Sequence, residues 1–420
     1  MDAIFGAVTG DQITLIKNDY GTPIYVYSES LLEQAARAAL DFPHQYGLTV
    51  RYAMKALPTR RILQLFEGYG LHIDASSYFE VQRAQKAGIS VEKIKLTAQQ
   101  LPAQEDITYF IAGGGKITAC SLTQLETIGK ALRGSSCREM GVRINPGLGS
   151  GHCNRTNVGG SASSFGIWHQ QIDQAKAIIK DYGLRVTALH THIGSGSDPD
   201  VWEEAAALSL GMVEQFSDVT TLDLGGGFKV ARVPEEKTTN LQECGTRVQA
   251  QFSAFYHRTK RELHLEIEPG TYLIANAGVI LAEVIDVKST DKYNFIVIDS
   301  GMTEIARPIL YGAQHLIMVL AYGHAPQHEV ESVVTGHCCE SGDVSTLVPH
   351  MPEEMLPRLL PEAKKGDILI VGGAGAYCSG MSLKNYNSFP EAAEVLLRKD
   401  GIIEPIRVRQ TLDQMVGNER

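Results

Sequence analysis

The chain has 420 residues, of which 44% are hydrophobic and 20% charged, a composition that is typical of an ordinary globular protein and excludes a disordered or fibrous chain. Its 38 Lys and Arg against 48 Asp and Glu give a net charge of -10, and no basic block supplies the surface that nucleic-acid binding needs. Neither a signal-peptide pattern nor a long apolar stretch is present, and the seven scattered cysteines favour reduced thiols, so we expect a cytoplasmic protein without membrane partners.

From about residue 48 onward, short apolar runs alternate with stretches of helical periodicity, the pattern of a parallel sheet covered by helices. The predicted strands are 49–55, 71–75, 94–97, 117–121, 140–145, 186–192, 220–224 and 263–268. The predicted helices include 59–68, 78–86, 122–132, 172–182, 202–216 and 242–260. Eight strand-helix units of this total length predict an α/β fold, a (β/α)8 TIM-like barrel.

After Gly278 the rhythm changes to strand-like runs separated by turns, with little helix between them. These runs predict a second, all-β domain of Greek-key or β-sandwich type. The opening run ITLIKNDYGTPIYVYS, residues 13–28, is also strand-like and is expected to join it. The expected domains are therefore a barrel over residues 30–278 and a β domain made of residues 1–29 and 279–420.

Charged residues stand at the carboxyl ends of predicted barrel strands, where the active site of such a barrel lies. Lys55 closes an apolar strand, and desolvation there lowers an amine pKa toward imine-forming values; the alternative is a lysine that reaches out to water. Asp74 ends the second strand. Glu268 ends a buried strand, which requires a cation or a protonated ring nitrogen nearby, or a structural salt bridge.

A histidine pair and a glycine run follow two later strands. His190 and His192 share one strand face, and His192 is suited to packing on a flat ring, or to a place in the core. Because a third ligand is missing, we predict no metal. The glycines at 225–227 can offer backbone N–H groups to a phosphate, although a plain tight turn explains them equally well.

The β domain carries two further motifs. HCCESGD at 337–343 contains adjacent Cys338 and Cys339, a spacing that argues against a zinc knuckle. GGAGAY at 372–377 is glycine-rich and ends in Tyr377, whose hydroxyl can reach an anion.

A lysine, a buried carboxylate, a ring-stacking histidine and a glycine loop are together what pyridoxal 5'-phosphate requires. The chain resembles the barrel-type pyridoxal-phosphate-dependent decarboxylases, and most closely the diaminopimelate decarboxylase family, through the ordered motifs YAMKA, HIGSG, DLGGG, EIEPG, RPILYG, CESGD and AGAY. The resemblance implies that Lys55 holds the cofactor covalently, that His192 stacks on its ring and that Glu268 pairs with the ring nitrogen. The implied cofactor-binding residues are Lys55, Asp74, His192, Ser195, Gly226, Gly227, Glu268, Gly270 and Tyr377.

The same resemblance implies a site for the far end of a small amino-acid substrate. Its residues would be Arg307, Tyr311, Glu340, Tyr377 and Thr271. Cys339 would act catalytically, with Lys55 and His192, and would enter from a partner subunit, so that the active sites are shared within a homodimer.

The reaction implied is the decarboxylation of meso-2,6-diaminopimelate to L-lysine and CO2, a step of lysine biosynthesis. The family usually carries Arg directly after EPG, where this chain has Thr271. Loss of one charge-assisted contact costs about 1.5 to 3 kcal/mol, so either Arg307 serves alone or the substrate lacks that carboxylate.

Other activities remain open on this sequence. They are decarboxylation of D-lysine, D-ornithine or a carboxylated polyamine or siderophore intermediate, and a non-catalytic regulatory role. An amino-acid racemase fits less well, because a carboxylate opposite the ring nitrogen favours a strong electron sink.

Overall fold

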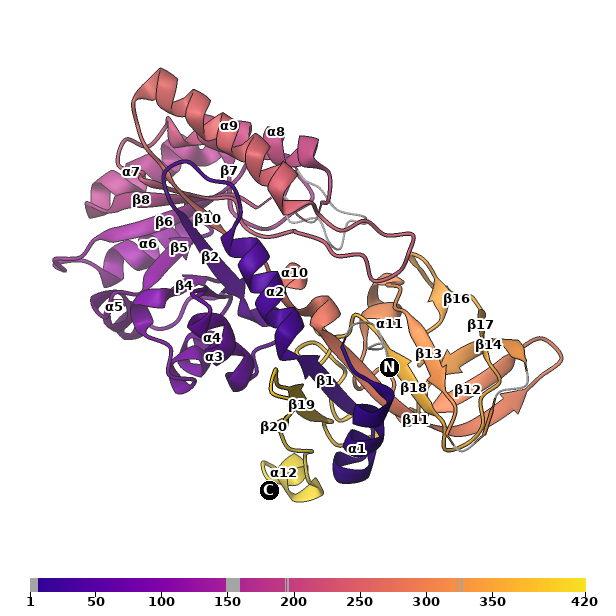
Figure 1. Cartoon of the computed structure of the whole chain (residues 1–420). Coiled ribbons are helices and arrows are strands. Elements are labelled where there is room, and N and C mark those ends of the chain that lie inside the picture. Colours follow the sequence, from indigo (N-terminus) through magenta and orange to yellow (C-terminus); the bar gives the residue numbers. More distant parts are fainter. Residues whose placement is uncertain (1–6, 149–158, 193, 195, 323, 326–327) are drawn as a thin grey trace. The chain divides into compact units, whose positions relative to one another are not determined.

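The computed structural model describes residues 7–148, 159–192, 194, 196–322, 324–325 and 328–420. The chain divides into two compact units (Figure 1). The barrel unit consists of Ala35–Lys229 and Lys237–Leu273, and the sheet-rich unit of Met1–Gln34, Val230–Glu236 and Ile274–Arg420.

Parallel strands close the barrel unit into a ring. In ring order they are β2 (Leu48–Ala53), β3 (His72–Ala75), β4 (Ile94–Thr97), β5 (Lys116–Ala119), β6 (Glu139–Asn145), β8 (Arg185–His190), β9 (Thr221–Asp223) and β10 (His264–Ile267). The ring closes because β10 pairs with β2 as well as with β9. The short β7 (Ile167–Trp168) extends the end of β6.

Helices follow the strands and surround the ring on its outside (Figure 1). They are α3 (Arg60–Gly68), α4 (Tyr78–Lys86), α5 (Gln104–Ala112), α6 (Leu122–Ala131), α7 (Ile172–Tyr182), α8 (Pro199–Val213) and α9 (Leu241–Thr259). The helix α2 (Glu29–Leu40) precedes the first barrel strand, and the division between the units falls within it.

The predicted barrel is confirmed, together with a separate sheet-rich domain. Each predicted strand overlaps an observed one, and the prediction 94–97 coincides with β4. The signal was strong because a parallel strand buried on both faces reads as an almost continuous apolar run. The (β/α)8 architecture therefore follows directly from sequence periodicity.

The sheet-rich unit contains a mixed sheet built around the long strand β11 (Gly278–Ser289). Its main path is β17 (Arg358–Pro361), β14 (Glu329–Thr335), β12 (Asn294–Ile298), β11, β1 (Ile24–Ser28), β19 (Ala393–Leu397) and β20 (Ile403–Arg407). Off this path, β18 (Ile368–Val371) pairs with β11 and with β13 (Ile317–Leu320), and β15 (Leu347–Val348) and β16 (Met351–Met355) form a small separate sheet. The unit also contains α1 (Gly10–Tyr20), α11 (Arg307–Tyr311) and α12 (Leu412–Val416).

The prediction that residues 13–28 are strand-like is wrong over its first half, which forms α1. Thr9 and Gln12 form a capping box at the start of this helix, and Ile13 and Ile16, one turn apart, are buried in the core of the sheet-rich unit. The β-branched residues suggested a strand, but the cap and the packing of one helix face stabilise a helix instead.

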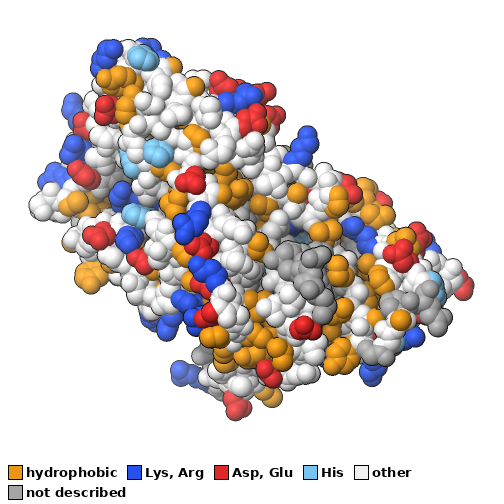
Figure 2. Space-filling model, viewed as in Figure 1, with side chains coloured by type: hydrophobic (Ala, Val, Ile, Leu, Met, Phe, Trp, Pro, Cys, Tyr) orange, Lys and Arg blue, Asp and Glu red, His pale blue; other side chains and the backbone are white. Residues whose placement is uncertain are grey.

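Lys and Arg side chains are interspersed with Asp and Glu side chains over the face seen in Figure 2. Among the described helices, none combines the length and the apolar character that a membrane crossing requires.

Candidate active site at the carboxyl end of the barrel

Lys55 lies just beyond the carboxyl end of β2, in the turn of 3-10 helix Met54–Ala56. Its side chain is exposed, whereas Asp74 in β3 and Glu268 after β10 are buried. Burial raises the pKa of Asp74 and Glu80, and the positive charge of Lys55 opposes this rise; the same charge helps to lower the pKa of Glu268, so Lys55 lies near all three carboxyl groups. The barrel thus brings together three of the residues that the sequence singled out.

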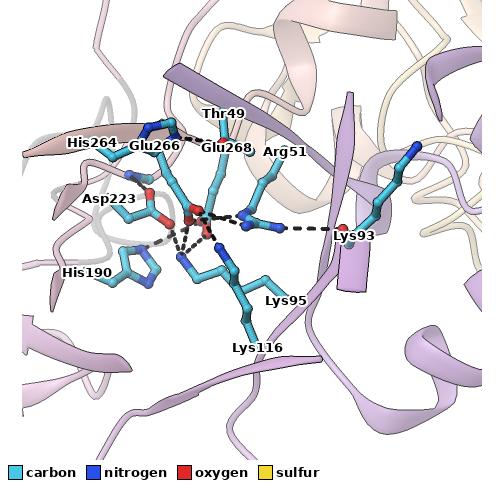
Figure 3. A network of polar contacts seen from close by, with 11 residues as sticks. Thr49, Arg51, Lys93, Lys95, Lys116, His190, Asp223, His264, Glu266 and Glu268 are labelled. Atoms are coloured by element: carbon cyan, nitrogen blue, oxygen red, sulfur yellow. Dashed lines mark hydrogen bonds and ion pairs between the residues drawn. The ribbon is translucent and has the colours of Figure 1, made fainter. Parts of the chain in front are cut away.

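A network of buried charges fills the barrel interior beneath this site (Figure 3). Arg51 grips Glu266 through two hydrogen bonds, Nε to Oε2 at 2.9 Å and Nη2 to Oε1 at 2.7 Å. The ammonium of Lys95 forms ion pairs with Asp223, with Glu266 at 3.4 Å and with Glu268 Oε1 at 3.2 Å. Burying these charges is costly unless each has an opposite partner, and here each has one.

The network fixes the protonation states of its carboxyl groups. Burial alone would raise the pKa of Glu268, but the charge of Lys95 outweighs it and holds that pKa below its ordinary value. Burial and the neighbouring Glu268 instead raise the pKa of Asp223 to about 6 and that of Asp74 well above its ordinary value. Burial would lower the pKa of Lys95, yet the three carboxylates raise it, so Lys95 remains a cation.

His190 and His192 extend this arrangement across the barrel end. Their rings are nearly parallel, with an interplanar angle of 20° and centroids 6.5 Å apart. Burial, then the positive charges around them, lower the pKa of both rings well below the ordinary value, so both are neutral. His190 Nε2 lies 3.6 Å from Glu268 Oε2.

His190, Asp223 and Glu268 also bring three potential metal ligands within 4.8 Å of one another. The ammonium of Lys95 already forms ion pairs with both of these carboxylates. The cation that this cluster needs is therefore supplied by the chain itself.

The glycine run after β9 packs directly against the site. Gly225 has a φ of 71°, and a side chain there would meet the His192 ring at 2.8 Å. A side chain at Gly226 would lie 2.4 Å from the backbone oxygen of Glu268. Asp223 Oδ1 accepts the Gly225 N–H at 2.7 Å, which ties the run to the charge network. Only glycine allows so close an approach, and it brings the backbone of the run to the strand ends.

Several buried polar atoms at this end of the barrel have no hydrogen-bond partner among the described residues. They are Asp74 Oδ1, His192 Nδ1 and Arg143 Nη2. Arg143 lies at the end of β6, 8% exposed, with its guanidinium 4.9 Å from the ring centre of Phe165. Since buried polar groups in folded proteins are normally paired, these atoms indicate a polar ligand.

The remaining predicted residues of the barrel unit are placed as follows. Gly270 is buried directly after the Glu268 strand end, and Thr271 begins the short helix α10 (Thr271–Ile274). The predicted Ser195 lies outside the described residues.

In the sheet-rich unit, a second group of predicted residues gathers around α11. Arg307 and Tyr311 stand one helical turn apart on this helix. Arg307 Nε donates to His315 Nε2 at 3.3 Å. Tyr377 has a left-handed backbone, with φ of 58°. Both Arg307 and Tyr377 affect the pKa of Arg232, so the three residues are near one another.

Cys339 and Glu340 lie in the loop after β14 and are both exposed. The Cys339 N–H donates to Asn387 Oδ1 at 2.7 Å, and Glu340 Oε1 accepts the Gly342 N–H at 3.1 Å. Within the described part of the chain, no hydrogen bond or ion pair joins these two residues to the cluster around α11.

No role was predicted from the sequence for Arg51, Lys95, Asp223, Glu266 or Arg232. A signal for the first four was present, because each is a charged residue in a predicted barrel strand, where a buried charge needs an opposite partner. Nothing in the local sequence distinguished Arg232 from an ordinary loop arginine.

Comparison with known proteins relates these features to a family. The family described as "Pyridoxal-dependent decarboxylase, pyridoxal binding domain" matches residues 29–275. The chain is 33% identical to a diaminopimelate decarboxylase of Streptomyces coelicolor, covering 99% of this chain and 93% of the relative. It is 32% identical to the enzyme of the same name from Escherichia coli K12, covering 98% and 97%.

Solved structures agree with these relatives. A crystal structure of a diaminopimelate decarboxylase is similar with a TM-score of 0.89 and 31% identity, covering 98% of this chain and 97% of that one. The diaminopimelate decarboxylase of Helicobacter pylori complexed with L-lysine has a TM-score of 0.83 and 25% identity, covering 97% and 98%. The chain therefore belongs to the pyridoxal-dependent decarboxylase family and, within it, to the diaminopimelate decarboxylases.

Proposed function

We propose that this chain decarboxylates meso-2,6-diaminopimelate to L-lysine and CO2 with pyridoxal 5'-phosphate as its cofactor. The observation that carries the proposal is the Lys55 ammonium among the carboxyl groups of Asp74 and Glu268, at the carboxyl end of a barrel. The full-length similarity to diaminopimelate decarboxylases supports the same reaction.

The residues at this end of the barrel fit pyridoxal phosphate. Lys55 provides an exposed amine, Glu268 an ionised carboxylate for a protonated ring nitrogen, and neutral His192 a flat face. The run at Gly226 offers backbone N–H groups, and the unpartnered Asp74 Oδ1 and His192 Nδ1 are atoms that a polar ligand would satisfy. When bound, the cofactor supplies an electron sink for the electron pair of the broken carbon–carboxylate bond.

The chain's own groups set the charge and the geometry for this chemistry. Lys95 keeps Glu268 ionised, so that Glu268 holds a proton at the ring nitrogen. His192 remains neutral and adds no competing positive charge against the ring. We propose that Lys55 would hold the cofactor, and that the surrounding residues would orient the substrate for the loss of its carboxylate.

For the other end of the substrate we propose Arg307, Tyr311 and Glu340, with Tyr377 and Thr271 beside them. Arg307 supplies a guanidinium suited to a carboxylate, and Glu340 a carboxylate suited to an ammonium. Ser195, Gly227 and Gly270 are proposed to help hold the phosphate.

We also propose a homodimer that works in the cytoplasm, with Cys339 acting in the active site of the partner subunit. The exposure of Cys339 supports this role, since an exposed thiol is available to a second subunit. All six cysteines in the described part of the chain are free, as a reducing compartment requires.

Release of CO2 by the purified holoenzyme tests the proposed reaction. We expect release from meso-diaminopimelate, and the appearance of L-lysine in equal amount. The Lys55→Ala variant should lose at least about a thousandfold in rate together with the absorbance of the lysine-bound cofactor, whereas Lys116→Ala, with a side chain 54% exposed, should keep both. Absence of CO2 from meso-diaminopimelate in the cofactor-loaded protein would refute the proposal.

Thr271 favours a second candidate, a decarboxylase of another diamino acid without the distal carboxylate. The same assay with D-lysine and D-ornithine separates the two. A higher kcat/KM for either of these than for meso-diaminopimelate would favour the second candidate.

A further inference from the structure

We infer that Arg232 and Arg307 form an anion site in the sheet-rich unit that binds the distal carboxylate of the substrate. The inference rests on the proposed function, because it names the group of the substrate that this site takes. Arg232 would then supply the positive charge that Thr271 does not.

Arg232 is held rigidly with part of its guanidinium unused. The residue is 7% exposed, and its Nε donates to the backbone oxygen of Gly373 at 2.9 Å. Its stem packs so closely on Gly373 that a side chain there would lie 2.8 Å from the Arg232 Cγ. Its Nη2 is buried and has no hydrogen-bond partner among the described residues.

Arg307 is oriented by a neutral histidine. His315 is buried, and burial followed by the charges of Arg307 and Arg232 lowers its pKa well below the ordinary value. Its Nδ1 lies 2.8 Å from the backbone oxygen of Gly372, so this nitrogen carries the proton and Nε2 accepts from Arg307 Nε at 3.3 Å. The remaining nitrogen atoms of Arg307 are left for another partner.

Arg232 and Arg307 are anchored to adjacent backbone positions, since Arg232 donates to Gly373 and His315, the partner of Arg307, contacts Gly372. Burial and then the charge of Arg307 lower the pKa of Arg232 to about 9, which reports that the two cations repel. The charge of Glu236 partly offsets this lowering of the Arg232 pKa, but its carboxylate accepts the backbone N–H of Arg232 at 2.7 Å, and none of the ion pairs among the described residues joins the two side chains. Two neighbouring cations, of which Arg232 is buried, are stabilised when an anion binds between them.

A carboxylate suits this cluster because two forked guanidinium groups match its two oxygen atoms. In the sequence, Arg232 lies five positions after Gly227, a stretch of chain that spans at most about 18 Å. The phosphate of the cofactor is the other anion of the reaction, so the experiment must distinguish the two.

The test uses two ligands of the holoenzyme that differ by one carboxylate. L-lysine, the expected product, keeps the carboxylate distal to the reacting carbon, and 1,5-diaminopentane lacks it. We expect Arg232→Met to weaken L-lysine binding about tenfold to a hundredfold while leaving diaminopentane binding within about twofold. Arg232→Lys should fall between Arg232→Met and the unmodified chain, since lysine keeps the charge but loses the fork.

The control variant is Arg398→Met, which removes a surface guanidinium of the same unit that pairs with Asp400 at 2.8 Å. It should leave both ligands unaffected. Equal weakening of both ligands by Arg232→Met, together with weaker binding of pyridoxal phosphate to the apoenzyme, would assign Arg232 to the phosphate and overturn the inference. Unchanged L-lysine binding would overturn it as well.

The assay of CO2 release separates this inference from the proposed function. If the unmodified chain decarboxylates meso-diaminopimelate and Arg232→Met has the same KM, only the inference fails. If the unmodified chain releases no CO2 from it, the proposed function fails first.

Discussion

Two groups of charged residues in this chain are built on opposite principles. In the barrel, Arg51 pairs with Glu266 and Lys95 with three carboxylates, so every charge has an opposite partner. In the sheet-rich unit, the neighbouring Arg232 and Arg307 have no carboxylate paired to them among the described residues. The contrast indicates that the first group holds the protein's own structure together, whereas the second awaits a charge from a ligand.

The charges of the barrel network are not evenly balanced along the barrel. Its fully buried members are the cations Arg51 and Lys95 and the anions Asp223, Glu266 and Glu268, so one negative charge is in excess. The excess lies at the carboxyl end of the strands, where Glu268 is placed. A protonated ring nitrogen at that end would balance the set, which explains why the network suits a pyridinium.

Removing Lys95 should have the largest effect on this contrast. In Lys95→Met, three carboxylates lose their shared cation in a site that is only 2% exposed. We expect a loss of about 3 to 5 kcal/mol in the free energy of unfolding, measured by denaturant titration. Lys116→Met is the matched control, because its side chain is 54% exposed and touches Glu266 only at 3.5 Å, and it should cost less than about 1 kcal/mol. Equal losses in both variants would contradict the distinction.

The residues of the two groups differ in how well the sequence predicts their place in the structure. The positions of Lys55 and Glu268 were predictable, because each directly follows an apolar strand. Active sites of such barrels lie at the carboxyl ends of the strands. Lys95 and Asp223 stand inside strands, and their partnership depends on the closure of the ring, which no local pattern reports. The cluster of Arg232 with Arg307 joins distant parts of the chain and could not be foreseen.

For helix α1 the local signal was present, but the segment was predicted to be a strand. Its Ile13 and Ile16 favour a strand by residue type, and the cap at Thr9 was a local signal that outweighs them. Packing of the helix face into the core completed the decision. The domain limits at residues 30 and 278 remain a proposal.

The glycine run offers a second test, at the backbone that the paired network anchors. In Gly226→Ala the new methyl group would lie 2.4 Å from the rigid backbone oxygen of Glu268, so either the run or the strand end must shift. We expect binding of pyridoxal phosphate to weaken about tenfold to a hundredfold, measured by fluorescence titration of the apoenzyme. Gly211→Ala in α8 meets no atom within 4 Å and should bind the cofactor normally. Normal binding by both variants would show that the run does not need to be close to Glu268.

Removing Arg232 should have a small effect on the stability of the ligand-free protein, in contrast to Lys95. Arg232→Met gives up the bond to Gly373 but also relieves the repulsion by Arg307. The two contributions oppose each other, and we expect the free energy of unfolding to change by less than about 1 kcal/mol. Denaturant titration of the ligand-free chain measures it. A loss as large as that of Lys95→Met would mean that Arg232 is a structural member of the fold rather than a ligand-binding one.

The smallest expected effect concerns pH, and it arises at the edge of the barrel network. Burial and then the charge of Arg51 lower the pKa of His72 to about 4, and the two residues are neighbours in register on β3 and β2. Between pH 6.5 and about 4, the unfolded chain therefore binds a proton at His72 that the folded chain does not, and stability falls as the pH falls. Above pH 6.5 the residue is neutral in both states and contributes no pH dependence. Because His72 is only half-buried, His72→Gln should flatten this decline by less than about 1 kcal/mol, and the exposed His257→Gln should not. If His72→Gln leaves the slope of the unfolding free energy against pH unchanged, the charge of Arg51 is neutralised by Glu266 and does not affect His72.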